Sequence, residues 1–207
     1  MFVNESNGHK FGNFHSYYTF HEQQSRTKLI PPNFFASLWK AQGGPAIFSI
    51  VDIGCNEGNL TLELYDRAVA ELPSHVSCLV LGIDLDSDLI ARAIKKSCDI
   101  SNVTFCTVDM MSGEDGEGIE LIKNYCTEKG IHGFSFASLF SITMWIHLNH
   151  GDVGFEKFLN SCATLLTDVR LHRNSRSLLL SSIKHLYLTE EKVLLYHFFH
   201  YDRWVAY

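Results

Sequence analysis

The chain is predicted to fold as an open α/β domain, with a mostly parallel sheet covered by helices on both faces. Two observations predict this class. Between residues 47 and 166, short apolar segments of strand length alternate with longer amphipathic segments of helix length, and successive strand–helix units build a parallel sheet with right-handed crossovers. The first apolar segment, Ile47–Ile53, is apolar at nearly every position, as expected of a strand buried on both faces.

Four strands are expected, each an apolar run between polar or glycine residues: Ile47–Ile53, Ser77–Ile83, Val103–Val108 and Phe134–Phe140. A short helix through Trp39 is expected after Pro31, before the first strand. The sheet is expected to be incomplete on its C-terminal side, because the alternation becomes irregular beyond Asp168.

Four helices are expected to follow the strands, because apolar residues recur at helical spacing in each segment. Glu57–Leu72 carries an apolar residue at every fourth position, and Pro73 ends it. Ser87 is expected to cap the next helix. Leu89, Ile90, Ala93 and Ile94 are expected on its buried face.

The third helix lies within Gly113–Lys129 and ends at Gly130, and the fourth spans Asp152–Leu166. In the last helix we expect Phe155, Phe158, Leu159, Cys162 and Leu166 to face inward.

Three regions are predicted along the chain. Residues 1–45 form an aromatic N-terminal segment and helix, residues 46–167 form the core, and residues 168–207 form an atypical tail. In the tail, Ser177–Ser181 is a candidate strand and Glu190–Arg203 a candidate amphipathic helix.

Composition restricts the function classes. The 207 residues are 46% hydrophobic and 19% charged, which is typical of a globular protein. The longest apolar runs fall short of the roughly 20 residues that span a bilayer, so no membrane partner is expected. The first ten residues are polar, so secretion is not expected. Six cysteines without a C-x-x-C pair indicate reduced thiols, and we expect a cytoplasmic location, with the nucleus as the alternative.

The net charge of −6 argues against recognition of nucleic acid by bulk electrostatics. The charge is uneven, because Val169–Tyr207 carries six Lys and Arg residues against three Asp and Glu residues. A small basic excess of this kind is typical of a solvated face, and contact with RNA is the alternative.

Ligands of such sheets bind at the carboxyl ends of the strands, and three predicted strands end in polar or glycine residues suited to a nucleoside. Asp52, Gly54, Asn56 and Gly58 follow the first strand and open a helix. Glycine there allows a ligand to approach the backbone and the helix N-terminus closely. The alternative is a tight turn without a ligand.

The second and third strands end in carboxylates. Asp84 is placed to accept the two ribose hydroxyls of a nucleoside, whereas Asp86 suits a helix N-terminus. Asp109 is placed to accept from an adenine amino group, with Met110 packed on the ring. The alternative for Asp109 is a solvated loop residue.

The segment from Ser141 to Asp152 follows the fourth strand and combines aromatic, amide and imidazole groups. His147 and His150 have the i, i+3 spacing of a metal pair, but Asp152 is the only nearby carboxylate and no cysteine is close. We therefore expect no metal. Contact with a substrate and packing against the core remain the two interpretations of these histidines.

Three stretches resemble the bicoid-interacting-protein-3 domain family of RNA methyltransferases. They run from Gly12 to His21, from Asp52 to Asn56, and from Ser141 to Asp152. The glycine loop is also similar to the D-x-G-x-G-x-G loop of class I methyltransferases, with Asn56 at the usual place of the middle glycine. The resemblance covers roughly residues 11–166 and is greater to the branch that methylates 5′ monophosphates of transfer RNA and precursor microRNA.

The resemblance implies a class I methyltransferase fold, S-adenosylmethionine as cofactor and the 5′ end of a small RNA as partner. It implies no particular protein partner. Cofactor contacts are expected from these residues: Tyr18, Arg26, Asp52, Gly54, Asn56, Asp84, Asp109 and Met110. His147, Asn149 and His150 are expected in the catalytic site, and His21, Lys28 and His147 on the substrate phosphate.

Two alternatives remain open. After the fourth helix, family members continue into a fifth strand ending in a Glu-Pro-Gln-type motif, whereas Leu166–His172 leads to a different sequence. An inactive, binding-only form is therefore one alternative. An NAD-dependent oxidoreductase is the other, because Asp84 suits both nucleosides, although the glycine spacing is not G-x-G-x-x-G.

Overall fold

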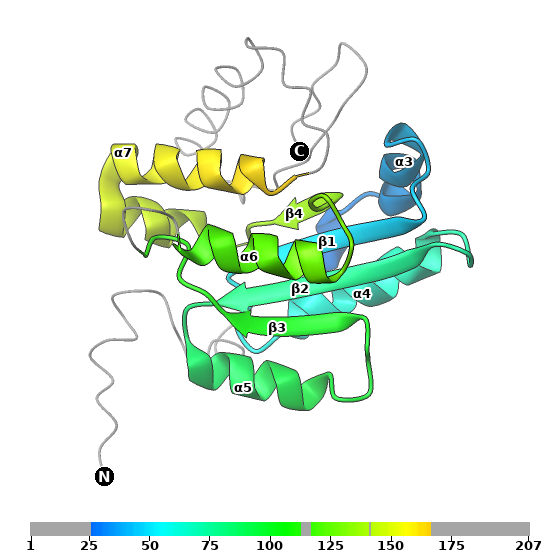
Figure 1. Ribbon diagram of the computed structural model, residues 1–207, viewed down its shortest axis with the longest axis horizontal. Helices are drawn as coiled ribbons and strands as arrows, with labels where there is room; N and C mark the ends of the chain where they lie inside the picture. The colour runs from blue at the N-terminus through cyan, green and yellow to red at the C-terminus, as the bar shows by residue number, and fades with distance from the viewer. Residues whose placement is uncertain (1–25, 113–116, 141, 167–207) are drawn as a thin grey trace.

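The computed structural model describes residues 26–112, 117–140 and 142–166 of the chain. Its centre is a parallel four-stranded sheet in the order β3-β2-β1-β4 (Figure 1). The strands are β1 Ile47–Ile53, β2 Ser77–Asp84, β3 Val103–Thr107 and β4 Phe136–Ser138. The predicted open, Rossmann-like α/β class is confirmed.

Helices cover both faces of the sheet, because strands with two apolar faces need two layers of cover. The helical elements are η1 Arg26–Leu29, α3 Phe34–Ala41, α4 Asn59–Glu71, α5 Ser87–Lys96, α6 Glu117–Glu128 and α7 Thr143–Thr164. Buried side chains of α3, α4 and α5 pack on one face, among them Phe35 and Leu64. Those of α6 and α7 pack on the other, among them Ile122 and Phe158. In Figure 1, α6 lies in front of the sheet and α4 behind it.

The order in which strands are added to the sheet reverses at β1. Strand β1 pairs with β2 on one side and with β4 on the other. In this register Asp52 lies opposite Gly82 of β2 and Ser138 of β4. Such a switch point is where ligands of open α/β sheets bind. The loop after β1 is therefore the natural place for a functional site.

The strand predictions hold closely for β1, β2 and β3, but the seven-residue fourth strand was wrong. Only Phe136–Ser138 form β4. The Phe134 N–H donates to the Leu165 carbonyl at 2.8 Å instead, and Phe134 bridges Leu166. Phe134 is thus paired with the end of α7, which the apolar pattern alone did not indicate.

The helix predictions need three corrections. The fourth helix starts at Thr143, not Asp152, and is broken at Gly151. Asp86, rather than Ser87, caps α5, because its side chain accepts the N–H groups of Asp88 and Leu89. Ile94 was expected inside α5's apolar face but is 51% exposed.

All six cysteines lie in the part of the chain that the structure describes, where none forms a disulfide and four are buried. Among the described helices, none combines the length and apolar character needed to cross a bilayer. The N-terminal segment up to residue 25 and the tail from residue 167 lie outside the described residues.

Candidate functional site

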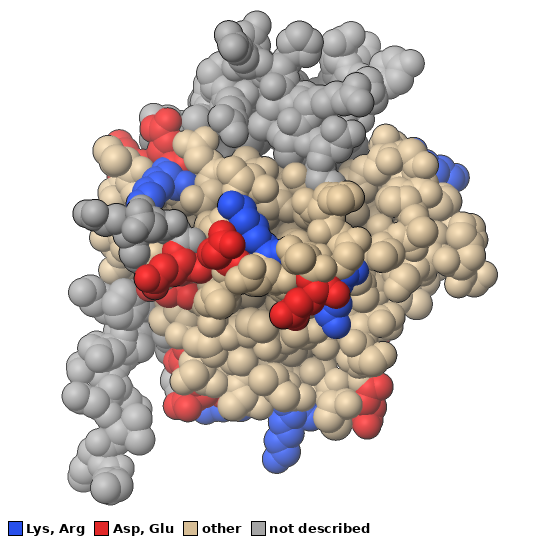
Figure 2. Space-filling model, in the orientation of Figure 1, with Lys and Arg blue, Asp and Glu red and all other residues tan. Residues whose placement is uncertain are grey.

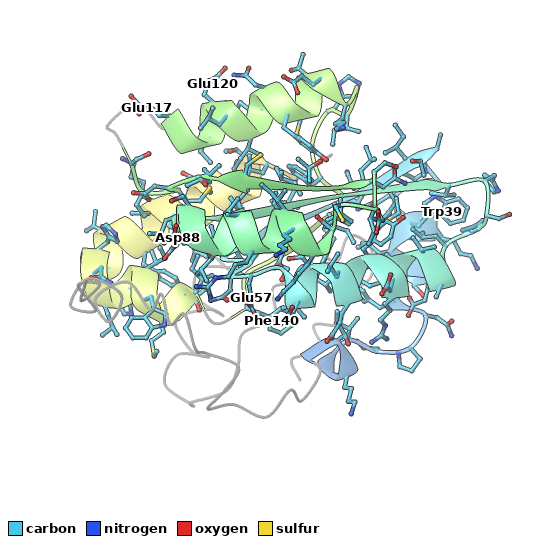
Figure 3. All side chains as sticks on the ribbon, turned by 90° about the horizontal axis from the view of Figure 1, so that it is seen from below. Trp39, Glu57, Asp88, Glu117, Glu120 and Phe140 are labelled. Carbon is cyan, nitrogen blue, oxygen red and sulfur yellow. The ribbon has the colours of Figure 1, made fainter. Side chains whose placement is uncertain are left out.

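The carboxyl ends of the strands carry the candidate site, as the sequence predicted. Gly54 and Cys55, after β1, both donate their N–H groups to the Ile83 carbonyl at 2.8 and 2.9 Å. The Val108 N–H, after β3, donates to the Asp84 carbonyl at 2.8 Å. In Figure 3, Asp88 at the start of α5 and Trp39 near the other end of β1 lie at opposite ends of the molecule. The site belongs to the Asp88 end.

The glycine loop, residues 54–58, is a turn that satisfies its own backbone. The N–H groups of Gly54 and Cys55 have Ile83 as acceptor, as above, and the Gly58 N–H donates to the Cys55 carbonyl at 3.0 Å. The Asn56 N–H donates to Asp84, and the Glu57 N–H donates to the Asn56 side chain at 2.8 Å. These five N–H groups are therefore already bonded within the protein. The loop offers a ligand close approach to the backbone instead.

Left-handed backbone explains which residues occupy the loop. Gly54, Asn56 and Gly58 have φ values of 78°, 52° and 81°. Asparagine is the non-glycine residue that tolerates this region best, because its side chain bonds locally. At Gly54 a Cβ would also lie 2.9 Å from Cδ1 of Ile142. The start of α7 therefore packs directly on the loop after β1.

Asp84, at the end of β2, is the half-buried carboxylate of the site. One oxygen accepts the Asn56 N–H at 2.9 Å and the other accepts the Asp86 N–H at 3.0 Å. Burial raises the pKa of Asp84, and the hydrogen bonds from the backbone of Asp86 and Asn56 oppose that rise. Each carboxylate oxygen can accept a second hydrogen bond, so the geometry suits a pair of ligand hydroxyls.

Asp52, which the motif grouped with the cofactor contacts, lies beneath the loop and is only 1% exposed. Its carboxylate accepts the Thr61 hydroxyl of α4 at 2.6 Å. This bond ties the end of β1 to α4. Thr61 was not singled out from the sequence, because a single threonine in a helix gives no local signal for such a contact.

Asp109 and Met110 follow β3 as predicted, in a surface turn. Asp109 is exposed, and its side chain accepts the Met111 N–H at 2.8 Å. Met110 is half-buried and packs on the core cluster of α6 and α7. Gly118 of α6 is needed there, since a Cβ would lie 2.4 Å from the Asp109 carbonyl oxygen. Helix α6 thus supports this turn from below.

The predicted catalytic residues lie on the first part of α7, before the break at Gly151. His147 Nε2 is 2.6 Å from Asp152 Oδ1. The Asn149 amide donates to the Trp145 carbonyl at 2.8 Å. His150 is exposed, and its Cβ lies 2.3 Å from the place a Cβ would take on Gly154. Among the described residues, no group of three or more His, Cys, Asp or Glu side chains could hold a metal.

The remaining predicted contacts lie near or before η1. Lys28 is exposed on η1, and Arg26 opens that element. Tyr18 and His21 lie outside the described residues.

Arg67 of α4 fixes η1, donating to the carbonyls of Thr27 and Pro31. Sequence reasoning missed this residue. Its i, i+4 pairing with Glu71 at 3.0 Å was readable on the predicted helix, but its partners 36 and 40 residues away were not.

The strand order and the glycine-lined edge define a class, namely open Rossmann-like α/β proteins that bind a ligand at the carboxyl ends of their strands. Comparison with known proteins makes this specific. Residues 134–170 match the family model described as Bicoid-interacting protein 3. The resemblance predicted from the motifs is therefore confirmed.

Curated relatives extend the match over three quarters of the chain. The pre-miRNA 5′-monophosphate methyltransferase of Danio rerio is 32% identical over 160 residues, covering 74% of this chain and 62% of that protein. The RNA 5′-monophosphate methyltransferase of Homo sapiens is 34% identical over 164 residues, covering 75% and 54%. The chain thus spans between half and two thirds of the length of these relatives.

Among solved structures, the bifunctional kinase-methyltransferase WbdD has a TM-score of 0.47 and 19% identity, covering 70% of this chain and 28% of that chain. A likeness of this strength adds nothing about function.

Proposed function

We propose that this chain binds S-adenosylmethionine at the carboxyl edge of its sheet and methylates the 5′ monophosphate of a small RNA. The observation that carries the proposal is the Asp84 carboxylate, half-buried and held by the Asn56 N–H next to a left-handed glycine loop. The relationship to 5′-monophosphate methyltransferases supports the RNA substrate. A cytoplasmic location stays a prediction.

The residues present suit an adenosyl cofactor. Gly54 lets the chain turn sharply after β1 with φ 78° and lets Ile142 pack directly on the backbone, which keeps the loop close to the carboxyl edge of the sheet. Asp84 would take the ribose hydroxyls, and Asp109 with Met110 would take the adenine. By the family resemblance, Tyr18 and Arg26 would contact the remainder, with Arg26 at the carboxylate. When bound, the cofactor supplies the methyl group on its sulfonium.

The methyl acceptor, a terminal phosphate, mainly has to be positioned by the protein. A terminal phosphate has a second pKa of about 6, so it is largely ionised at neutral pH and needs no strong general base. The protein would hold two phosphate oxygens and leave the third in line with the methyl group. His147 and Asn149 on α7 would donate to the phosphate, with His150 beside them and with Lys28 and His21 from the N-terminal side.

The two alternatives make different predictions. An NAD-dependent enzyme would need the G-x-G-x-x-G spacing, which the loop from Gly54 to Gly58 lacks. A binding-only form would take up cofactor without transferring a methyl group. Titration and turnover therefore have to be measured separately.

The first test is calorimetric titration of the full chain with S-adenosylhomocysteine. Wild type should bind, and Asp84→Asn should weaken binding at least about tenfold, because one charge-assisted acceptor is lost. Asp88→Asn is the matched control, since Asp88 is an exposed aspartate four residues on, at the start of α5 (Figure 3). Equal weakening by both variants would contradict the assigned role of Asp84.

The second test is methyl transfer to one RNA carrying either a 5′ monophosphate or a 5′ hydroxyl. Transfer to the monophosphate alone supports the proposal. Cofactor binding without transfer to either RNA would favour the binding-only form, and absence of cofactor binding by the folded chain would reject both.

A further inference from the structure

We infer that Asp152 is a positioning residue for His147, and that the break of α7 at Gly151 exists in this chain to bring the two together. The inference rests on the proposed function, because His147 is there assigned to the RNA phosphate. The first observation is the contact itself: His147 Nε2 lies 2.6 Å from Asp152 Oδ1, at the short end of hydrogen bonds between a nitrogen donor and a carboxylate.

This contact would not form in a continuous helix. Residues five apart are turned by about 140° from one another around an α-helix, so their side chains do not meet. At Gly151 the backbone has φ 63° and ψ −170°, outside the helical region. These angles are almost restricted to glycine. The break therefore redirects the chain so that Asp152 returns to the face that carries His147.

The imidazole is held from a second side as well. Its ring lies 5.3 Å from that of Phe155, with the planes tilted by 33°, and Phe155 is buried in the core under α7. A ring packed on one aromatic side chain and bonded at Nε2 has its orientation fixed. Preorganised donors of this kind favour binding, because less freedom is lost when the ligand arrives.

The pair also lies near the carboxyl ends of the strands, where the candidate cofactor site is. Ile142, at the start of α7, packs on Gly54 after β1, and a Cβ added to Gly154 would lie 3.7 Å from Cε of Met111 after β3. Both segments of α7 thus contact loops of the candidate cofactor site, and His147 stands between these two contacts in the chain.

Stability does not account for the pair. The Asp152 side chain is 80% exposed and that of His147 35% exposed. Exposed ion pairs contribute little to folding, because water screens them and ordering the side chains costs entropy. A short, aligned pair at an exposed position next to a candidate site is better explained by what it orients.

The test is a double-mutant cycle of methyl transfer to 5′-monophosphorylated RNA, using wild type, Asp152→Ala, His147→Ala and the double variant. Asp152→Ala should raise the KM for RNA about tenfold, as expected for loss of one oriented charge-assisted bond. It should have no further effect once His147 is alanine. Affinity for S-adenosylhomocysteine and the midpoint of urea unfolding should not change.

Two further variants separate orientation from fold. Asp152→Asn keeps an acceptor for the imidazole and should restore most of the KM. Gly151→Ala should act like Asp152→Ala, although nothing lies within 4 Å of its added Cβ. Its matched control is Gly130→Ala, at the end of α6, with φ 66° and equally open space, which should cost stability without changing the KM.

Several outcomes would overturn the inference. They are an Asp152→Ala variant as active as wild type, an equal loss in the His147→Ala background, or an Asp152→Asn variant as impaired as alanine. A wild-type chain that binds cofactor but transfers no methyl group to the RNA would instead contradict the proposed function, and this role of Asp152 would be rejected with it.

Discussion

At the scale of single residues, the site depends on backbone conformations that few side chains permit. Asn56 occupies the left-handed region with φ 52°, where the related loop usually has glycine. Its side-chain oxygen accepts the Glu57 N–H at 2.8 Å, which offsets part of the conformational cost. Asparagine therefore preserves the turn that places the Asn56 N–H on Asp84.

Asn56→Ala should lower the free energy of unfolding by about 1–2 kcal/mol, because alanine is strained in the left-handed region. Asn56→Gly loses the same side-chain bond but not the backbone freedom, so it should remain close to wild type. Urea unfolding of the two variants checks this. Equal destabilisation would mean that the hydrogen bond, not the backbone, decides the residue.

Asp84 should make cofactor binding sensitive to acid. Burial raises its pKa, so Asp84 takes up a proton at a higher pH than an exposed aspartate does. A protonated carboxyl offers ribose one acceptor fewer. Affinity for S-adenosylhomocysteine should therefore fall as the pH is lowered from neutral towards the raised pKa of Asp84, by at most about tenfold per pH unit.

Calorimetry at a series of pH values measures this dependence, and Asp84→Asn should bind weakly with a flatter profile. A wild-type profile that does not change over the range would show that Asp84 does not bear on cofactor affinity.

At the scale of elements, hydrogen bonds from one arginine of α4 fix the segment that carries Arg26 and Lys28. Arg67 donates to the carbonyls of Thr27 and Pro31 and pairs with Glu71. Glu71 in turn accepts the Phe35 N–H at 2.8 Å, at the start of α3. Helix α4 therefore sets the position of both η1 and α3.

Arg67→Ala should lower the free energy of unfolding by about 2 kcal/mol, because two carbonyls and a carboxylate lose a charged partner. Arg67→Lys should recover only part of this, since an ammonium cannot reproduce the planar fork of donors. Chemical denaturation measures both, with Lys95→Ala, exposed on α5, as control. A lysine variant equal to wild type would mean that charge alone suffices.

At the scale of the whole molecule, the charge distribution bears on how RNA would be recognised. The chain has a net charge of −6. Figure 2 shows acidic and basic side chains interspersed among the described residues of the face that α6 covers, with no continuous basic patch on that face. A surface of this kind suits capture of a phosphorylated end rather than tracking along a phosphate backbone.

The affinity for 5′-monophosphorylated RNA should accordingly depend weakly on salt, with a slope of log K against log salt of about −1 to −2. Removing the 5′ phosphate should cost more affinity than shortening the strand. Fluorescence anisotropy on RNAs with either 5′ end, at several salt concentrations, measures both effects. A slope several times steeper would instead indicate binding along the backbone.

The sequence by itself determined the order and type of the elements and the edge that carries the site. Apolar runs set the bounds of β1 within the chain, and the motif residues Gly54, Asp84 and Asp109 follow successive strands. These features are local, so periodicity and spacing reveal them. The family resemblance came from the same short stretches.

Only the tertiary structure decided how distant residues meet. The contact of Asp152 with His147 depends on backbone angles at Gly151. Arg67 donates to the carbonyls of Pro31 and Thr27, which lie 36 and 40 residues before it in the chain. The N–H groups of Gly54, Cys55 and Asn56 bond to Ile83 and Asp84, about 28 residues further along the chain. Such pairings follow from packing geometry, which a pattern along one chain does not contain.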